Sequence, residues 1–546
     1  MDSAVPRSVA GSVLLILILS LPLYLVHLGR TGLSDPDEPY YAVPAHEMMD
    51  SGTYDVPVFH GRPWFDKPIL FYWIVMTAFL LFGVSEASAR IGSVLAAAGG
   101  LLAVFALGRR VCRHPMGPLG AAIVLATSFE YVILARAAVT DMALTLFITL
   151  GMLAAARCIE DGRPLQAGLA GAAFGLATLT KGPVGALLPA LALVMYLIAA
   201  RRADLVRPRL LATALAGFVL TAGPWYVYME LRYPNLLLGT FLGQGNLGRF
   251  LAPEHRAFPF YYVAVLLAGL LPWSGGLPAA LWHAARPSIW SDERRTGAAP
   301  GSLFLLCWFG AVLAVFSLSA SKLPSYILPA FPPAALLLGD YWAGALARVH
   351  VANRPRGTMF SAWLGILIGA GALLALVLVL HRAALSAAAP SALTAGTLLV
   401  AGALLGLFAV RRRSWPGMFF AQGSAAAAAI LILCVFALPA IEEFDSMRPL
   451  VLQLRAQGID GRIVGAYRAH DVGLEFYLGR QVPLVDDPGE LRARVGAEPG
   501  GVWIVLTRDL PKLRSDAALT VEPLLERPCR SAVRLGPAHP GMGHGR

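Results

Sequence analysis

The sequence predicts a polytopic α-helical membrane protein with about 13 transmembrane helices and a small α/β domain at its C-terminal end. Of its 546 residues, 57% are hydrophobic and only 14% are charged, whereas soluble domains average roughly 45–50% apolar residues. Apolar stretches recur along most of the chain, and their lengths are close to the roughly 20 residues that a helix needs to cross a bilayer. After residue 440 they give way to shorter helix-like and strand-like segments.

The first apolar stretch, residues 8–28, contains no Asp, Glu, Lys or Arg, and no small-residue cleavage site precedes the acidic segment that follows. We interpret it as a retained span and not as a signal peptide. Residues 69–82 are predicted to form an interfacial helix, because an extra crossing there would move every later basic loop across the membrane. The thirteen predicted spans are residues 8–28, 88–108, 117–136, 139–157, 165–180, 182–200, 208–228, 258–283, 301–319, 323–343, 359–380, 391–410 and 417–440.

Arginine clusters indicate the side of the membrane on which each loop lies. They occur at residues 109–113, 157–163, 201–209, 286–295, 348–356 and 411–413. By the positive-inside rule, these loops are cytoplasmic. The other loops, including 29–87 and 229–257, are then predicted to face the periplasm or the cell exterior. Because the net charge of +11 is spread over short loops, it predicts no nucleic-acid partner.

The chain is predicted to divide into a membrane domain, residues 1–440, and a soluble α/β domain, residues 441–546, with a disordered tail. An odd number of spans puts this second domain on the outer side. Strands are expected near residues 462–467, 481–485 and 502–507. The domain lacks a phosphate-cradling glycine loop and a nucleophile elbow, so we expect the chemistry on the outer loops of the membrane domain.

The first outer loop carries the densest acidic motif beside the membrane, which reads Ser34-Asp35-Pro36-Asp37-Glu38-Pro39-Tyr40-Tyr41. Carboxylates there could orient a substrate, act as a general base or hold a cation. The alternative is a solvated loop in which an Asp caps a helix. The motif alone does not separate these interpretations.

Basic residues recur in the same set of loops. Lys67, in Trp64-Phe65-Asp66-Lys67-Pro68, could bind a lipid phosphate or anchor the chain at the interface. Arg249 and Arg256 precede the eighth span, where guanidinium groups could bind phosphate oxygens or simply be solvated. Further ionisable residues on this side are Arg136, Asp141, Lys181 and Lys322. The histidines lack a regular metal-ligand spacing, so no metal site is predicted.

Several short motifs occur together in a characteristic order. They are Asp37-Glu38 with Tyr41-Ala42, Phe65-Asp66-Lys67-Pro68, Ala138-Val139-Thr140-Asp141, Leu179-Thr180-Lys181-Gly182 and Ser321-Lys322-Leu323-Pro324-Ser325-Tyr326-Ile327-Leu328-Pro329. Over residues 10–345, their order resembles the protein O-mannosyltransferase superfamily, and within it the bacterial aminoarabinose transferase branch. The resemblance implies a GT-C glycosyltransferase of the inner membrane. In this branch, 4-amino-4-deoxy-L-arabinose passes from undecaprenyl phosphate to a lipid A phosphate on the periplasmic face.

The resemblance also implies roles for individual residues. Asp37 is expected to be the loop carboxylate near the reaction centre, with Asp141 as a second acidic residue. Donor-phosphate ligands are expected at Lys67, Arg249 and Tyr326. Further substrate-binding residues are expected at Glu38, Tyr41, Arg256, Lys181 and Lys322, with Arg256 as a rival to Arg249.

Two departures from the branch leave the donor sugar and the acceptor open. Tyr40 stands where the branch often has Arg, and Asp66 stands where it often has Glu. No cofactor is predicted beyond the polyprenyl-phosphate sugar, and a divalent metal is assigned to no residue. The expected partners are that donor, lipid A or another envelope acceptor, and the lipids of the inner membrane.

Two alternatives to lipid A modification are kept. One is transfer of another sugar to a protein or to an envelope glycan. The other is a secondary transporter, in which an inverted repeat is expected. No convincing repeat is found in the sequence, and the long acidic first loop together with the exported C-terminal domain favours transfer chemistry.

Overall fold

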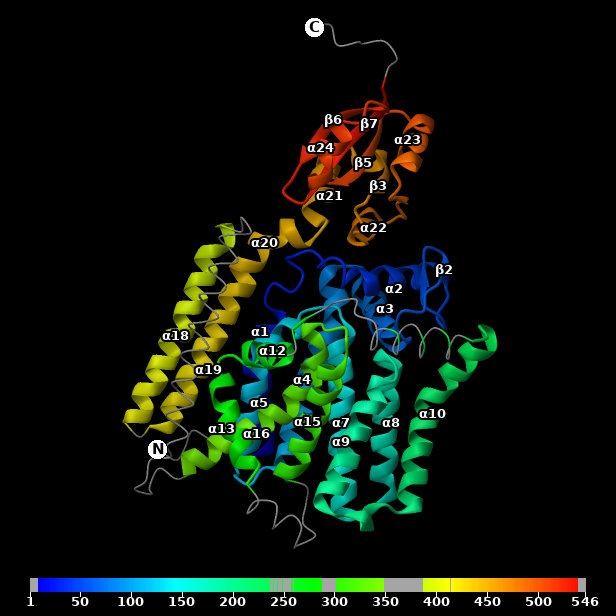
Figure 1. The fold of residues 1–546 in the computed structure, drawn as a ribbon. Helices are drawn as coiled ribbons and strands as arrows, with labels where there is room; N and C mark the ends of the chain where they lie inside the picture. The colour runs from blue at the N-terminus through cyan, green and yellow to red at the C-terminus, as the bar shows by residue number, and fades with distance from the viewer. Residues whose placement is uncertain are drawn as a thin grey trace.

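The computed structural model describes residues 8–235, 257–286 except 259, 301–347, 386–412 and 414–538, together with three single glycines at 239, 243 and 248. Long helices form a bundle, and a mixed β-sheet lies beyond one end of it (Figure 1). The chain is a polytopic helical membrane protein. The predicted span 359–380 and the tail after residue 538 lie outside the described residues.

The bundle is built from apolar helices in chain order. They are α1 (Val9–Leu25), α4 (Glu86–Val111), α5 (Gly117–Ala126), α6 (Phe129–Ala135), α7 (Thr140–Asp161), α8 (Pro164–Lys181), α9 (Val184–Ala200), α10 (Pro208–Arg232), α12 (Tyr261–Gly269), α13 (Leu277–Ala284), α15 (Ser302–Leu318), α16 (Phe331–Ala347), α18 (Ala389–Arg411), α19 (Trp415–Ile432) and α20 (Leu438–Asp445). Sequence signals set several of the boundaries. Proline at the first position starts α8 and α10, and the Ser85 and Ser88 side chains form a capping box at the start of α4.

Two predicted spans are not continuous helices. The span 117–136 is bent by 63° between α5 and α6. There Thr127 Oγ1 donates to the Ile123 carbonyl at 2.7 Å, which also accepts from the Thr127 backbone N–H. Ser128 Oγ donates to the Val124 carbonyl at 2.6 Å, in place of the Ser128 backbone N–H, which bonds to the Leu125 carbonyl instead. The span 258–283 forms two short helices, α12 and α13, which are separated by residues 270–276.

The count of thirteen spans stays a prediction. Among the described residues, five helices are long and apolar enough to cross a membrane, or six if the bent pair α5 and α6 is taken as one span. Helix α3 (Leu70–Phe82) has 13 residues and is therefore about 20 Å long at roughly 1.5 Å per residue. That length is less than the roughly 30 Å of a hydrocarbon core, which favours the predicted interfacial position.

The first outer loop folds over one end of the bundle. Helices α2 (Pro39–Ser51) and α3 lie between the long helices and the sheet region (Figure 1). Strands β1 (Val58–Phe59) and β2 (Arg62–Pro63) form a small hairpin between them. Its two turn residues, His60 and Gly61, have φ values of 55° and 67°, as a two-residue hairpin turn with both central residues at positive φ requires.

The chain after residue 447 forms a five-stranded sheet in the order β4-β3-β5-β7-β6. Its elements are α21 (Arg448–Ala456), β3 (Ile463–Tyr467), α22 (Gly473–Leu478), β4 (Leu484–Val485), α23 (Pro488–Ala497), β5 (Gly501–Leu506), α24 (Leu510–Arg514), β6 (Leu519–Glu526) and β7 (Arg530–Pro537). The first three strands are parallel, and β7 pairs antiparallel with both β5 and β6. Strands β3, β4 and β5 overlap the three predicted strand segments, whereas β6 and β7 were not predicted.

Both faces of this sheet are covered. On the central strand β5, Val502 and Ile504 belong to one buried apolar cluster, and Trp503 and Val505 belong to another. This alternation follows from the two-residue period of a strand. The sheet therefore has a core of its own on each side.

Candidate functional site

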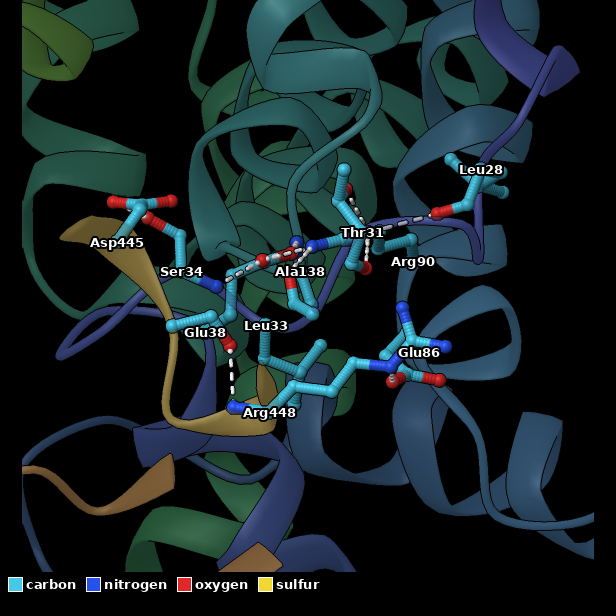
Figure 2. Close-up of polar contacts among 12 residues, drawn as sticks. Leu28, Thr31, Leu33, Ser34, Glu38, Glu86, Arg90, Ala138, Asp445 and Arg448 are labelled. Atoms are coloured by element: carbon cyan, nitrogen blue, oxygen red, sulfur yellow. Dashed lines mark hydrogen bonds and ion pairs between the residues drawn. The ribbon is translucent and has the colours of Figure 1, made fainter. Parts of the chain in front are cut away.

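The acidic motif of the first outer loop is anchored by Glu38, which is only 2% exposed. Its Oε1 accepts hydrogen bonds from Arg90 Nε at 2.8 Å and from the Ala138 backbone N–H at 2.7 Å. Its Oε2 accepts from Arg90 Nη2 at 2.6 Å and from the Ser34 backbone N–H at 2.8 Å. Glu38 therefore connects the first loop to α4 and to the segment before α7 (Figure 2).

Arg90 completes this anchor. Its guanidinium donates to the backbone carbonyls of Leu28 at 2.7 Å, Thr31 at 3.0 Å and Gly32 at 2.7 Å. The side chain is buried near the first turn of α4, so it fixes the chain between α1 and the acidic motif. Arg90 was not predicted as a functional residue, although it is a lone arginine inside the predicted apolar span 88–108, where a charged side chain signals a buried partner. Glu38 is structural here, and the substrate contact expected of it stays a prediction.

A second ion pair lies where α7, α8 and the 3-10 helix Pro324–Ala330 meet. Lys181, the last residue of α8, donates from Nζ to Asp141 Oδ1 at 2.6 Å. The two side chains are 12% and 6% exposed. Lys181 Nζ also lies 4.7 Å from the centroid of the Tyr326 ring, within the range of a cation–π contact. The structure therefore brings together three residues that the sequence motifs place far apart.

Tyr41, on α2, is buried close enough to Asp141 for the charge of that carboxylate to act on its hydroxyl group. Its ring packs edge-on against Phe71, with centroids 5.2 Å apart. Burial raises the pKa of the Tyr41 hydroxyl well above its usual range, and the negative charges of Asp66, Asp141 and Asp37 raise it further. Carboxylates from three predicted motifs therefore act on the same hydroxyl group.

Lys67 forms an ion pair with the residue before it, Asp66. Its Nζ donates to Asp66 Oδ2 at 2.7 Å, and the two side chains are 14% and 27% exposed. The preceding Phe65 packs on Tyr233, which follows α10, with ring centroids 5.1 Å apart. Asp37 is exposed in the turn that leads into α2. We call Asp37, Tyr41, Asp66, Lys67, Asp141, Lys181 and Tyr326 the outer cluster.

Lys322 has a different environment. It is 8% exposed, and its Nζ donates to the carbonyls of Ser317 at 2.9 Å and Phe316 at 3.4 Å and also to the carbonyl of Ser319. These carbonyls lie at the end of α15, where a helix leaves carbonyls without intrahelical partners. The observed role of Lys322 is therefore to cap α15, and the substrate contact expected of it stays a prediction.

The remaining predicted ligands, Arg249 and Arg256, lie outside the described residues. Within the described part of the chain, no three His, Cys, Asp or Glu side chains are placed so that they could hold a metal ion. The outer cluster thus offers ammonium groups, carboxylates and aromatic rings at one end of the bundle. Such groups can bind an anionic lipid headgroup and orient a polar acceptor.

The fold of the chain is similar to that of two solved structures of one bacterial membrane protein. The crystal structure of ArnT from Cupriavidus metallidurans bound to undecaprenyl phosphate superposes with a TM-score of 0.78 at 23% sequence identity, over 96% of this chain and 98% of that one. The apo structure of the same protein gives a TM-score of 0.75 over the same shares of the two chains.

Sequence comparisons agree with the fold. The sequence model of the dolichyl-phosphate-mannose-protein mannosyltransferase family matches residues 66–228. The undecaprenyl phosphate-alpha-4-amino-4-deoxy-L-arabinose arabinosyl transferase of Erwinia tasmaniensis is 34% identical over 65% of this chain and 63% of its own length. The protein of the same name from Pseudomonas aeruginosa is 33% identical over 58% of this chain and 57% of its own length.

These findings confirm the predicted resemblance to the aminoarabinose transferase branch of the protein O-mannosyltransferase superfamily. The alignments extend over less than two thirds of the length of these relatives. Activity, donor and acceptor are therefore taken up as proposals.

Proposed function

We propose that the chain is a GT-C glycosyltransferase that moves 4-amino-4-deoxy-L-arabinose from undecaprenyl phosphate to a lipid A phosphate. The outer cluster carries the proposal, because it gathers Asp37, Lys67, Asp141, Lys181 and Tyr326 at one end of the bundle. We further propose that this end faces the periplasm across the bacterial inner membrane. Residues 1–440 would form the transferase domain and residues 441–546 a periplasmic domain.

Charge in the outer cluster indicates how the donor phosphate would be bound. Asp37, Asp66 and Asp141 supply three carboxylates, and Lys67 and Lys181 supply two ammonium groups. A phosphate would therefore meet one negative charge in excess, which opposes its binding at short range. Either Arg249 or Arg256 of the loop 229–257 would cancel this excess, and both together would reverse its sign, so we propose that at least one of them belongs to the phosphate site.

The proposed reaction is an inverting displacement. An acceptor oxygen attacks the anomeric carbon of the sugar, and the bond from that carbon to the lipid phosphate oxygen breaks on the opposite face. The departing phosphate carries away the electron pair and gains negative charge. Lys67, Lys181 and a loop arginine would stabilise this charge, and such stabilisation is strongest where charge increases in the transition state.

The role of Asp37 depends on the acceptor. A lipid A phosphate is already ionised and needs no base, so Asp37 would orient the acceptor or the amino group of the sugar. A hydroxyl acceptor must lose a proton, and Asp37 would then act as the general base. The exposed position of Asp37, in the turn that leads into α2, suits contact with an entering acceptor.

The test measures transfer by the purified protein and by cells. Asp37→Ala should lower turnover by about 100-fold or more, the scale of general acid–base or charge-stabilising groups, and should leave undecaprenyl-phosphate affinity unchanged. Lys67→Ala should weaken that affinity. Asp50→Ala is the matched control, because Asp50 lies on α2 with its side chain 66% exposed. Near-normal turnover of Asp37→Ala would refute the catalytic assignment.

Mass analysis of lipid A from cells with and without the protein identifies the acceptor. Addition of a pentosamine to a lipid A phosphate is the expected result. If lipid A is unmodified and a protein or envelope glycan is newly glycosylated, lipid A is not the acceptor, and the proposed transfer reaction still holds with that other acceptor.

A further inference from the structure

Four consecutive residues of the first outer loop are hydrogen-bonded to the chain after residue 440. Gly32 N–H donates to Glu442 Oε1 at 2.7 Å, Leu33 N–H donates to Tyr477 Oη at 2.7 Å, Ser34 Oγ donates to Asp445 Oδ1 at 2.9 Å, and Asp35 N–H donates to the Asp445 carbonyl at 2.8 Å. The chain after residue 440 therefore holds in place the loop segment, residues 32–35, that precedes Asp37. We call this contact the loop seam.

Within the loop seam, the carboxyl group of Asp35 packs directly against Gly473. Its Oδ1 accepts a hydrogen bond from the backbone N–H of Gly473, the first residue of α22, at 2.8 Å. Its Oδ2 is buried and has no hydrogen-bond partner. A Cβ atom on Gly473 would lie 2.7 Å from Asp35 Oδ1 and closer still to Oδ2. Only glycine at position 473 leaves room for the Asp35 carboxyl group.

The surroundings of Asp35 contain groups of both charges. Asp471 and Arg530 form an ion pair at 2.6 Å beside it. The pKa of Asp35 is raised to about 7, chiefly by burial and then by the charge of Asp471, while the backbone N–H of Gly473, the charge of Arg530 and the backbone N–H of Met447 act in the opposite direction. Tyr40, whose own pKa is raised by burial and by Asp66, Asp35 and Glu475, faces it from α2. Asp445 approaches from α20 through its backbone carbonyl.

The turn that carries Asp37 is thus held on both sides. Asp35 precedes it and is fixed to α22, and Glu38 follows it and is fixed to Arg90. Pro36 lies between the two aspartates and restricts its own φ. With both neighbours anchored, the position of the Asp37 backbone depends on where α22 sits.

We propose that Asp35 is a positioning residue, which seats the Asp37 turn on α22 so that the C-terminal region takes part in sugar transfer. This inference rests on the role of Asp37 in the proposed function. Reacting groups must be held to within fractions of an ångström, and a small misplacement can cost about 100-fold in rate. The C-terminal region then contributes through geometry, without touching the substrate.

The first test replaces Gly473 by alanine in the full-length protein. The methyl group should displace the Asp35 carboxyl group, lower kcat by about tenfold or more, and change the KM for undecaprenyl-phosphate aminoarabinose by less than about twofold. Gly496→Ala is the matched control, because Gly496 lies in the same region, has no atom within 4 Å of the added Cβ and has no positive φ. Equal kcat values for the two variants would overturn the proposal.

A second pair of variants does not depend on tolerance of the methyl group. Asp35→Asn keeps an oxygen that accepts from the Gly473 N–H, whereas Asp35→Ala removes it. Asparagine should retain most of the wild-type kcat and alanine should lose it, with donor KM unchanged in both. Equal turnover of the two Asp35 variants would refute positioning by this bond, and a raised donor KM would point to a role in donor binding instead.

Parallel measurements on Asp37→Ala separate the two proposals. If Asp37→Ala is inactive while the Asp35 and Gly473 variants turn over normally, positioning fails and the proposed function stands. If Asp37→Ala is as active as the wild type, the catalytic role of Asp37 fails and the positioning role falls with it.

Discussion

The buried pair of Glu38 and Arg90 allows a quantitative prediction. Replacing Glu38 by glutamine preserves the shape and one acceptor oxygen of the side chain. The second oxygen becomes an NH₂ group, which then faces two donors where the carboxylate accepted both. Arg90 is only 5% exposed, and the substitution also leaves its guanidinium group without a negative charge beside it.

The magnitude follows from this geometry. Removing one partner of a buried ion pair typically costs about 3–5 kcal/mol. Arg90 keeps its bonds to three backbone carbonyls, so we expect the lower value, about 3 kcal/mol, which is a little over 100-fold in an equilibrium constant. Because Glu38 joins the first loop to the segment before α7, the loss should appear in both segments together.

Hydrogen exchange of backbone amides measures this loss directly. The amides of Ser34 and Ala138 donate to Glu38, and their protection should fall by about 100-fold in Glu38→Gln. Glu490→Gln is the control, since its partner Arg494 lies 3.0 Å away on the surface of α23 and both side chains are nearly half exposed. Such a pair contributes roughly 0.3–0.5 kcal/mol. Wild-type protection of the two amides in Glu38→Gln would refute the assigned role.

Three further predictions concern single side chains. Lys322→Met should lower the free energy of unfolding by about 1–3 kcal/mol, because the end of α15 loses its donor, and should leave donor-lipid affinity unchanged; weakened affinity would support a substrate contact. Since the pKa of Asp35 is raised to about 7, its neutral form fits the loop seam, and the stability that the seam has at low pH is lost as the pH rises through about 7. Exchange of the Gly473 amide, corrected for its intrinsic pH dependence, should therefore accelerate between about pH 4 and pH 7 in the wild type and level off above pH 7, because the carboxyl group has its ordinary pKa of 3.8 when the seam is open and about 7 when it is closed. An identical acceleration in Asp35→Asn would contradict this assignment. Lys181→Met should abolish transfer and destabilise the fold, because Asp141 is left buried without its cation. The double variant Lys181→Met/Asp141→Asn should regain stability in thermal unfolding but not transfer, which would separate the two effects.

Local sequence signals were sufficient for much of the fold. Apolar runs located nearly every described helix of the bundle, because a bilayer requires about 20 apolar residues for each crossing. The same signals missed the bend between α5 and α6 and the break between α12 and α13, since hydropathy does not report backbone direction. Strand β6 was missed because most of its residues are exposed or half-buried, which weakens the apolar pattern. Strand β7 is largely buried, and it was missed because Arg530, Ser531 and Arg534 interrupt its apolar residues.

For the outer cluster, too, the sequence predicted the individual residues and the structure showed how they are arranged. The order of short motifs in the sequence identified Asp37, Lys67, Asp141, Lys181 and Tyr326 as candidates, since each motif is a local run of residues. Their meeting around Tyr41 is a property of the packed bundle. Lys322 belongs to the same group of motifs, and only its position at the end of α15 distinguishes it from the others.

By itself the sequence determined that this is a membrane protein, because hydropathy is set residue by residue, and it predicted a polar site in the loops of one side. The tertiary structure decided which carboxylates of the acidic motif are held by other parts of the chain and which one is exposed. Glu38 is fixed by Arg90, Asp35 is fixed by Gly473, and Asp37 lies exposed between them. The partners of Glu38 and Asp35 are 52 and 438 residues away in the chain, and no local pattern encodes a contact across such separations.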